Sequence, residues 1–245
     1  MKHYELTEET IDWYGHTLHR IKATKDLPQH GIMAGALGGF VESEKNLSDD
    51  AWVFDDAKVY GYAEVCGNAL VDGHAQVFGG AKVYGNAWVF GGAKVYGNAE
   101  VCGDAIVSGY AEVYGYAKVF GDAWVFGEAR MHGNAQVFDN AKVYENVVVC
   151  ENAVVRGDAA VCGNAWVFGD AVIQSNEDYI VFKNWWSSGR YFTWTRSNDM
   201  WLVGCFYGTG EELIKKAYKD SELSGKCYEQ TVKYAETINN IMKQK

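Results

Sequence analysis

A six-residue periodicity constrains this chain more than any other feature of its sequence. Large apolar residues occupy every sixth position without a gap from Val41 to Ile173, which makes 23 hexads. Two residues before them runs a second series of 21 positions, from Ala51 to Ala171; twenty hold alanine, and the exception is Val147. Most gaps between these pairs hold Gly-Asn, Gly-Asp, Gly-Gly or Gly-Tyr. Each hexad therefore reads small, variable, large aliphatic, variable, turn, turn.

This pattern predicts a short strand followed by a bend. Alternate side chains of a strand point to opposite faces, so the alanine and the aliphatic residue two positions later both point inward. Glycine and asparagine tolerate the positive φ that a sharp corner demands. A helix is excluded, because a period of six does not keep to one helical face and glycine recurs at every corner. One unit buries nothing alone, whereas stacked units bury a continuous core.

The array resembles the hexapeptide-repeat, left-handed parallel β-helix family, in which three hexads make one triangular coil of 18 residues. The left hand is implied by this resemblance, since the general crossover rule favours the opposite hand. If each coil adds one strand spacing of ~4.8 Å, the array predicts a prism roughly 35–40 Å long. The sequence departs from the commonest family pattern at the position after the aliphatic residue, which is often Tyr, Phe or Cys.

The 18-residue coil assigns every outward residue to one of three sides. The tetrapeptide AWVF begins at Ala51, Ala87 and Ala123, so these copies are two coils apart and share a side, whereas the copy at Ala165 lies on another. The other two sides carry charged columns and are expected to face solvent. The shared side is largely apolar for five coils, and a bare stripe of this length exceeds what soluble monomers tolerate. We expect an interface formed by Trp52, Phe54, Leu70, Trp88, Phe90, Ile106, Trp124 and Phe126.

The charge and composition of the chain narrow its partners. The net charge is −10, and residues 41–174 carry all of it with 18 acidic and 8 basic side chains. An acidic prism is a poor partner for nucleic acid or an anionic membrane. No apolar run approaches 18 residues, and no signal peptide opens the sequence. The six cysteines lack CxxC spacing, so we expect reduced thiols in a cytoplasmic protein.

Two segments flank the array, which divides the chain into residues 1–40, 41–174 and 175–245. The first is expected to form a hairpin around Tyr14–Gly15. The last is expected to form a small α/β cap, with strands in 179–186, 190–197 and 200–208, the latter two joined at Asn198–Asp199. Thr209 and Glu212 form a capping box ahead of helices over about 210–219 and 225–242. The predicted fold class is an all-β solenoid whose ends are closed by these caps.

Three motifs make the resemblance more specific. The stretches TLHRIKA, GALGGFVESEKNLS and GCFYGTGEEL, combined with the alanine-rich array, resemble the YdcK-like hexapeptide proteins of phages and prophages. The likeness extends over nearly the whole chain. It implies an architecture and a mobile-element origin rather than an activity.

The sequence offers little support for catalysis. Many hexapeptide-repeat proteins are acyltransferases that use a histidine and a loop thrown out from the coils, but the register here is unbroken. The array holds His74 at a corner and His132 on an outer face, and neither has a plausible acid partner nearby in sequence. The γ-class carbonic anhydrases need three zinc histidines, which the array does not supply. The corner column of Asn and Asp is interpreted as bends rather than as a calcium ladder. We therefore expect no catalytic residue, metal or cofactor.

The flanking segments contain basic residues that would bind a phosphate or nucleotide if they were grouped in space. These candidate anion-binding residues are Arg20, Lys22, Lys183, Arg190 and Arg196.

The leading hypothesis is a non-enzymatic, phage-type scaffold or binding protein that self-associates through its apolar side. The expected assembly is a homotrimer first and a two-fold dimer second; the third option is that a cap of the same chain covers the stripe. One alternative is a protein that sequesters a small anionic, nucleotide-like signal of host defence. The other is a hexapeptide acyltransferase. A host protein remains open as a partner.

Overall fold

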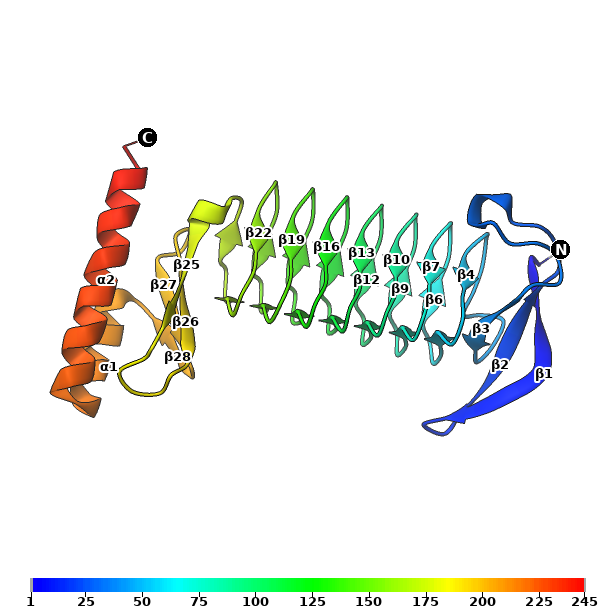
Figure 1. Cartoon of the computed structure of the whole chain (residues 1–245), viewed down its shortest axis with the longest axis horizontal. Coiled ribbons are helices and arrows are strands. Elements are labelled where there is room, and N and C mark those ends of the chain that lie inside the picture. Colours follow the sequence, from blue (N-terminus) through cyan, green and yellow to red (C-terminus); the bar gives the residue numbers. More distant parts are fainter. Residues whose placement is uncertain (1, 245) are drawn as a thin grey trace.

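The computed structural model describes residues 2–244. The chain forms a parallel β-solenoid of about seven turns, with an antiparallel hairpin at its N-terminal end and a small sheet with two helices at its C-terminal end (Figure 1). The predicted solenoid and its small C-terminal cap are therefore confirmed. The left hand of the coil stays a prediction from the resemblance.

The solenoid has three parallel sheets, and each is named here after its first two-residue strand. The β4 sheet contains β4 (Trp52–Val53), β7 (Leu70–Val71), β10 (Trp88–Val89), β13 (Ile106–Val107), β16 (Trp124–Val125), β19 (Lys142–Val143) and β22 (Ala160–Val161). The β5 sheet contains β5 (Lys58–Val59), β8 (Gln76–Val77), β11 (Lys94–Val95), β14 (Glu112–Val113), β17 (Arg130–Met131), β20 (Val148–Val149) and β23 (Trp166–Val167). The β6 sheet contains β6 (Glu64–Val65), β9 (Lys82–Val83), β12 (Glu100–Val101), β15 (Lys118–Val119), β18 (Gln136–Val137), β21 (Val154–Val155) and β24 (Val172–Ile173).

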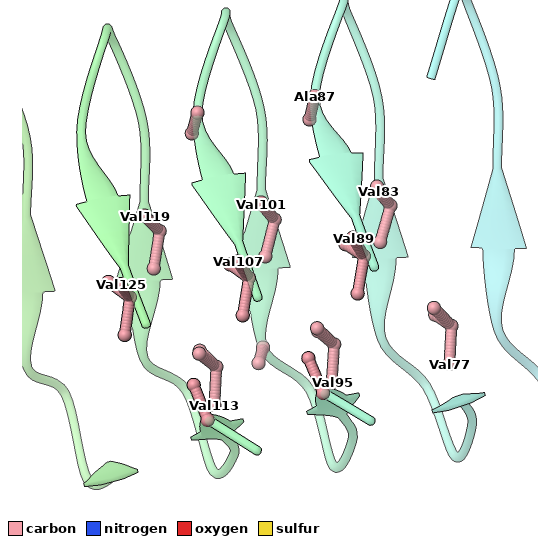
Figure 2. Packing of buried hydrophobic residues seen from close by; sticks show 14 of the residues in the cluster. Val77, Val83, Ala87, Val89, Val95, Val101, Val107, Val113, Val119 and Val125 are labelled. Carbon is pink, nitrogen blue, oxygen red and sulfur yellow. The ribbon is translucent and has the colours of Figure 1, made fainter. Parts of the chain in front are cut away.

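The inward residues form one continuous core along the prism. All 21 positions of the alanine series are at most 1% exposed, and the aliphatic residues stack beside them from coil to coil (Figure 2). The first two hexads begin the array differently: Val41 ends β3 (Leu37–Val41), and Leu47 makes an isolated bridge to Val65. The 23 predicted hexads are thus accounted for from β3 to β24.

The two residues of each corner have different roles. The first corner residue has a positive φ at every corner from Asp49 to Gly169, and glycine holds most of these positions. Asparagine occupies the second corner position, so it does not supply the positive φ expected of it. Instead its side chain links coils: Asn68 Nδ2 donates to Asn86 Oδ1 at 3.1 Å, and Asn86 Nδ2 donates to Asp104 Oδ1 at 2.8 Å.

The N-terminal cap extends the β5 sheet. Strands β1 (Tyr4–Trp13) and β2 (His16–Ala23) form the predicted hairpin, and both turn residues, Tyr14 and Gly15, have positive φ. Strand β2 pairs antiparallel with β3, which pairs in parallel with β5. A short 3₁₀ helix, η1 (Pro28–His30), lies between β2 and β3.

The C-terminal cap contains η2 (Asn176–Asp178), β25 (Tyr179–Lys183), β26 (Tyr191–Thr195), β27 (Met200–Val203), β28 (Phe206–Gly208), α1 (Gly210–Asp220) and α2 (Glu222–Met242). The single strand expected over 200–208 is wrong, because a turn at Gly204, with φ of 60°, folds it into the β27–β28 hairpin. The capping box of Thr209 and Glu212 is confirmed. Helix α2 begins before residue 225 because the Ser221 hydroxyl accepts a hydrogen bond from the Ser224 amide.

Candidate binding surfaces

The predicted apolar columns lie together on the outside of the β4 sheet. Trp52 is only 1% exposed, because the N-terminal cap covers it: the His3 ring lies 6.2 Å from its indole, and the Gly38 backbone packs against it. Further along, Trp88 is 37% and Trp124 is 43% exposed. The remaining members are partly buried: Phe54, Leu70, Phe90, Ile106 and Phe126. The cap therefore covers only the first coil of this surface, which is called the Trp face below.

Aromatic rings pair along the Trp face. The Trp88 and Phe90 ring centroids lie 4.4 Å apart, and those of Trp124 and Phe126 lie 6.5 Å apart. The Phe126 ring also stacks on Tyr144 at 4.9 Å. The Trp88–Phe90 pair is tilted and the Trp124–Phe126 pair is edge-to-face. The face ends at Lys142, whose Nζ lies 5.2 Å from the centre of the Trp124 ring.

The outside of the β5 sheet, one of the two sides expected to carry charged columns, also carries an aromatic ladder formed by the residues that follow the aliphatic positions. Tyr60, Phe78, Tyr96, Tyr114 and His132 stack on consecutive strands with ring centroids 4.9–5.0 Å apart. His132 takes the place of a Tyr or Phe in this ladder, as predicted, and its ring packs on that of Tyr114. Burial lowers the pKa of the His132 imidazole below its usual value.

A groove lies where the C-terminal cap meets the end of the β5 sheet. It consists of two hollows, of about 520 Å³ and about 320 Å³, that share Trp166, Leu202, Gly204 and Cys205 as lining residues. Its remaining lining residues are Tyr114, Arg130, His132, Val148, Cys150, Asn164, Phe168, Arg190, Tyr191 and Tyr207. The backbone amide of Trp166 donates to Thr193 Oγ1 at 2.9 Å, which joins β23 to β26 and fixes the cap beside the groove.

The charges in this groove contrast with those of the chain. Arg130 and Arg190 line it, and neither guanidinium makes a hydrogen bond or an ion pair within residues 2–244. No Asp or Glu of the described residues is among the lining side chains, although the chain carries a net charge of −10. The groove is thus locally positive in a chain whose net charge is negative.

The five basic residues proposed from the sequence do not form one group. Arg20 and Lys22 lie on β2 at the N-terminal end, where Arg20 Nε donates to Glu9 at 2.7 Å and Lys22 Nζ donates to Glu5 at 3.1 Å. The other three lie in the C-terminal cap at the opposite end (Figure 1): Arg196 pairs with Asp178 at 3.7 Å, Lys183 lies over the Tyr191 ring, and Arg190 lines the groove.

Two histidines acquire carboxylate neighbours through the fold. His74 Nδ1 lies 4.0 Å from Asp56 of the preceding coil, so the expectation that it lacks an acid partner does not hold in space. His16, which the sequence reasoning did not consider, lies 2.9 Å from Glu42 beside a hollow of about 620 Å³. The hydrogen bond from His16 lowers the pKa of the Glu42 carboxyl. A carboxylate holding an imidazole in this way can assist proton transfer.

Several other features bear on what the surfaces can bind. All six cysteines are free thiols. Within the part of the chain that the structure describes, no three His, Cys, Asp or Glu side chains gather in a way that could hold a metal ion. No helix in residues 2–244 is both long and apolar enough to cross a bilayer.

One comparison bears on the identity of the repeat. The family model for the YdcK beta solenoid repeat matches residues 135–151. This match and the solenoid around it make the chain similar to YdcK β-solenoid repeat proteins. The matched YdcK segment spans β18, β19 and β20, one strand from each sheet, and so corresponds to a single coil. No curated protein matches the chain.

Proposed function

We propose that this YdcK-like protein is a non-enzymatic scaffold or binding protein of phage or prophage type that self-associates in the cytoplasm through its Trp face. The observation that carries the proposal is the pair of partly exposed tryptophans, Trp88 and Trp124, on one regular parallel sheet. Aromatic anchors of this kind concentrate the free energy of association. The five uncovered strands from β7 to β19, by one hexad, give a face of about 20 Å by about 20 Å. Two copies would bury roughly 800 Å² in total, which is the size of a weak interface.

The arrangement of side chains favours a two-fold dimer with antiparallel axes. Trp88 and Trp124 lie in register on either side of Ile106, and Phe90 and Phe126 repeat the same symmetry in the neighbouring column. A dyad running along β13 sets β10 of one copy against β16 of the other. Each tryptophan then meets a tryptophan and each phenylalanine meets a phenylalanine, as an isologous interface requires.

The charged residues at the edges of the Trp face support the same orientation. Asp72, on the coil of β7, and Tyr144, on the coil of β19, are equally far from β13, so the antiparallel dimer places the carboxylate opposite the phenol hydroxyl and near Lys142. Partial burial already raises the pKa of the Asp72 carboxyl. Parallel axes would set Asp72 against Leu70 instead, which leaves a carboxylate buried on an apolar side chain. A homotrimer, the assembly that the hexapeptide resemblance implies, is the competing outcome.

Sedimentation velocity with mass determination tests the proposal. We expect a dimer for the wild type and a monomer for Trp88→Glu, with Trp185→Glu as the matched control, because Trp185 is 78% exposed in the C-terminal cap. A charge reversal at Asp72 or Lys142 is expected to weaken the dimer, and reversing both is expected to restore it. A wild-type monomer at every concentration refutes self-association. A trimer that is insensitive to Asp72 and Lys142 refutes the antiparallel arrangement alone.

The unpaired arginines of the C-terminal groove favour a second candidate function, the sequestration of a small anion. The acyltransferase alternative draws support from the contacts of His16 with Glu42 and of His74 with Asp56. Both histidines lie at the N-terminal end of the solenoid.

A further inference from the structure

We infer that the groove between the C-terminal cap and the β5 sheet binds a mononucleotide, a small ligand that joins a flat aromatic ring to a phosphate. The inference rests on three side chains, Arg130, Trp166 and Arg190, which come from two different parts of the chain. It is independent of self-association, because the groove and the Trp face lie on different sheets.

Trp166 offers the ring a stacking surface. Trp166 is 46% exposed on β23, the last strand of the β5 sheet, and it lines both hollows. The hydrogen bond from its backbone amide to Thr193 fixes the strand that carries it. Stacking of a base on such a ring adds affinity and tolerates any base, because every base has an aromatic face.

Arg130 lies in the same outward column as Trp166. Strands β17, β20 and β23 are adjacent, with Arg130 paired to Val148 and Val148 paired to Trp166, so the two residues are two strand spacings, or ~9.6 Å, apart. Val148 between them is 9% exposed and forms an apolar floor. The nearest carboxylate on the neighbouring strand, that of Glu112, is held by Lys94 at 3.4 Å, and Arg130 keeps its guanidinium for a ligand.

Arg190 approaches the groove from the cap. Its carbonyl accepts a hydrogen bond from the Asn184 amide at 2.8 Å, which anchors its backbone just before β26. Its Nη1 lies 3.7 Å from the position that a β-carbon on Gly204 would take, so the guanidinium rests against the β27–β28 turn. Lys183, over the Tyr191 ring at 5.5 Å, adds a cation next to the groove. Guanidinium groups match phosphate oxygens bidentately, which favours a phosphate over a carboxylic acid of similar size.

The size and surroundings of the groove select a single nucleotide over a nucleic acid. The two hollows, of about 520 Å³ and about 320 Å³, are in the range of small-molecule sites. A longer polyanion leaving the groove would meet the carboxylates of Glu151 and Asp170, which flank the groove residues His132 and Tyr207. The net charge of −10 adds a general repulsion.

Isothermal titration calorimetry of the full chain with AMP, adenosine and inorganic phosphate tests the inference. We expect saturable binding of AMP, weaker binding of either part alone, and an affinity that falls as salt rises. Arg190→Gln and Arg130→Gln are each expected to weaken AMP binding at least about tenfold, which is the loss of one charge-assisted hydrogen bond. Trp166→Ala is expected to do the same. Arg156→Gln, on the β6 sheet side, is the matched control and is expected to keep the wild-type affinity.

Two results would overturn the inference. One is that AMP, GMP, CMP and UMP all fail to bind, and the other is that AMP binds as tightly to the Arg130→Gln, Arg190→Gln double variant as to the wild type. Inorganic phosphate that binds as tightly as AMP refutes the stacking role of Trp166. Circular dichroism melts of each variant identify any that fail to fold, and the single substitutions then replace the double one. Trp88→Glu is expected to change the mass of the assembly and leave AMP affinity intact, so the two proposals fail separately.

Discussion

The close approach of successive coils at their corners predicts an unusual order of stabilities at Gly109. Its φ is 68°, and an added β-carbon would lie 2.9 Å from both the amide nitrogen and the carbonyl oxygen of Gly127 in the next coil. Alanine in this left-handed conformation costs about 1–2 kcal/mol, and relieving contacts with a neighbouring backbone adds about 1–2 kcal/mol more. We expect Gly109→Ala to lower the free energy of unfolding by about 2–4 kcal/mol.

Aspartate at the same position is expected to be less harmful than alanine. Asp139 occupies an equivalent corner with a φ of 59°, and its Oδ2 accepts a hydrogen bond from the amide of Gly157, one coil further on, at 3.0 Å. Gly109→Asp can make the same bond to the Gly127 amide, which recovers about 1 kcal/mol. Gly31→Ala is the control for φ alone, because Gly31 has a φ of 67° but no atom within 4 Å of an added β-carbon; it is expected to cost about 1–2 kcal/mol.

Thermal and urea unfolding followed by circular dichroism measure this order. Each kcal/mol corresponds to roughly 2–4 °C in Tm for a chain of this size. The reasoning is refuted if Gly109→Ala and Gly31→Ala cost the same, since the contact between coils then contributes nothing. It is equally refuted if Gly109→Asp is no more stable than Gly109→Ala.

Three further predictions concern the core, catalysis and thiol reactivity. Ala99→Leu should overpack a side chain that is 0% exposed and cost ~1–3 kcal/mol, and an unchanged melting temperature would contradict its inward position. Acetyl-CoA should neither bind in calorimetry nor donate its acetyl group. Saturable binding would contradict this prediction, most clearly if His74→Ala or His16→Ala abolished it. Burial raises the pKa of the Cys150 thiol to about 11, so at mildly alkaline pH iodoacetamide should label exposed Cys205 first, and unfolding in urea should remove the difference.

The sequence predicts the solenoid well because its periodicity repeats one local rule many times. Alanine and an aliphatic residue two positions apart must share a face, and the corner glycines fix the length of each strand, so no long-range information is needed. The hairpin at Tyr14–Gly15 and the capping box at Thr209 are likewise decided by neighbouring residues. The same local logic missed the turn at Gly204, because the β-prone residues on both sides of it read as one continuous strand.

The binding surfaces depend on contacts that the repeat does not encode. Arg130 and Arg190 are brought to one groove only because the C-terminal cap docks beside Trp166 through Thr193. The burial of Trp52 likewise depends on an aperiodic N-terminal segment that folds over the first coil. Periodicity cannot place the residues at the two ends of the chain relative to the array. For this reason the sequence could not decide whether the five basic residues of the caps lie together, and in the structure they do not.

Because the six-residue register is unbroken, the number of hexads in the array sets both the distance between the two caps and their relative rotation about the solenoid axis. Removing or duplicating 18 residues would change the distance between the two caps by ~4.8 Å and leave every outward column in line. Removing a single hexad would turn the C-terminal cap by one third of a revolution, because the last strand would then belong to a different sheet. Arg190 would face another side of the prism, and Arg130 would no longer share a groove with it. Relatives that differ in length are therefore expected to differ by whole coils wherever the groove is retained, and by other multiples of six only where it has been lost.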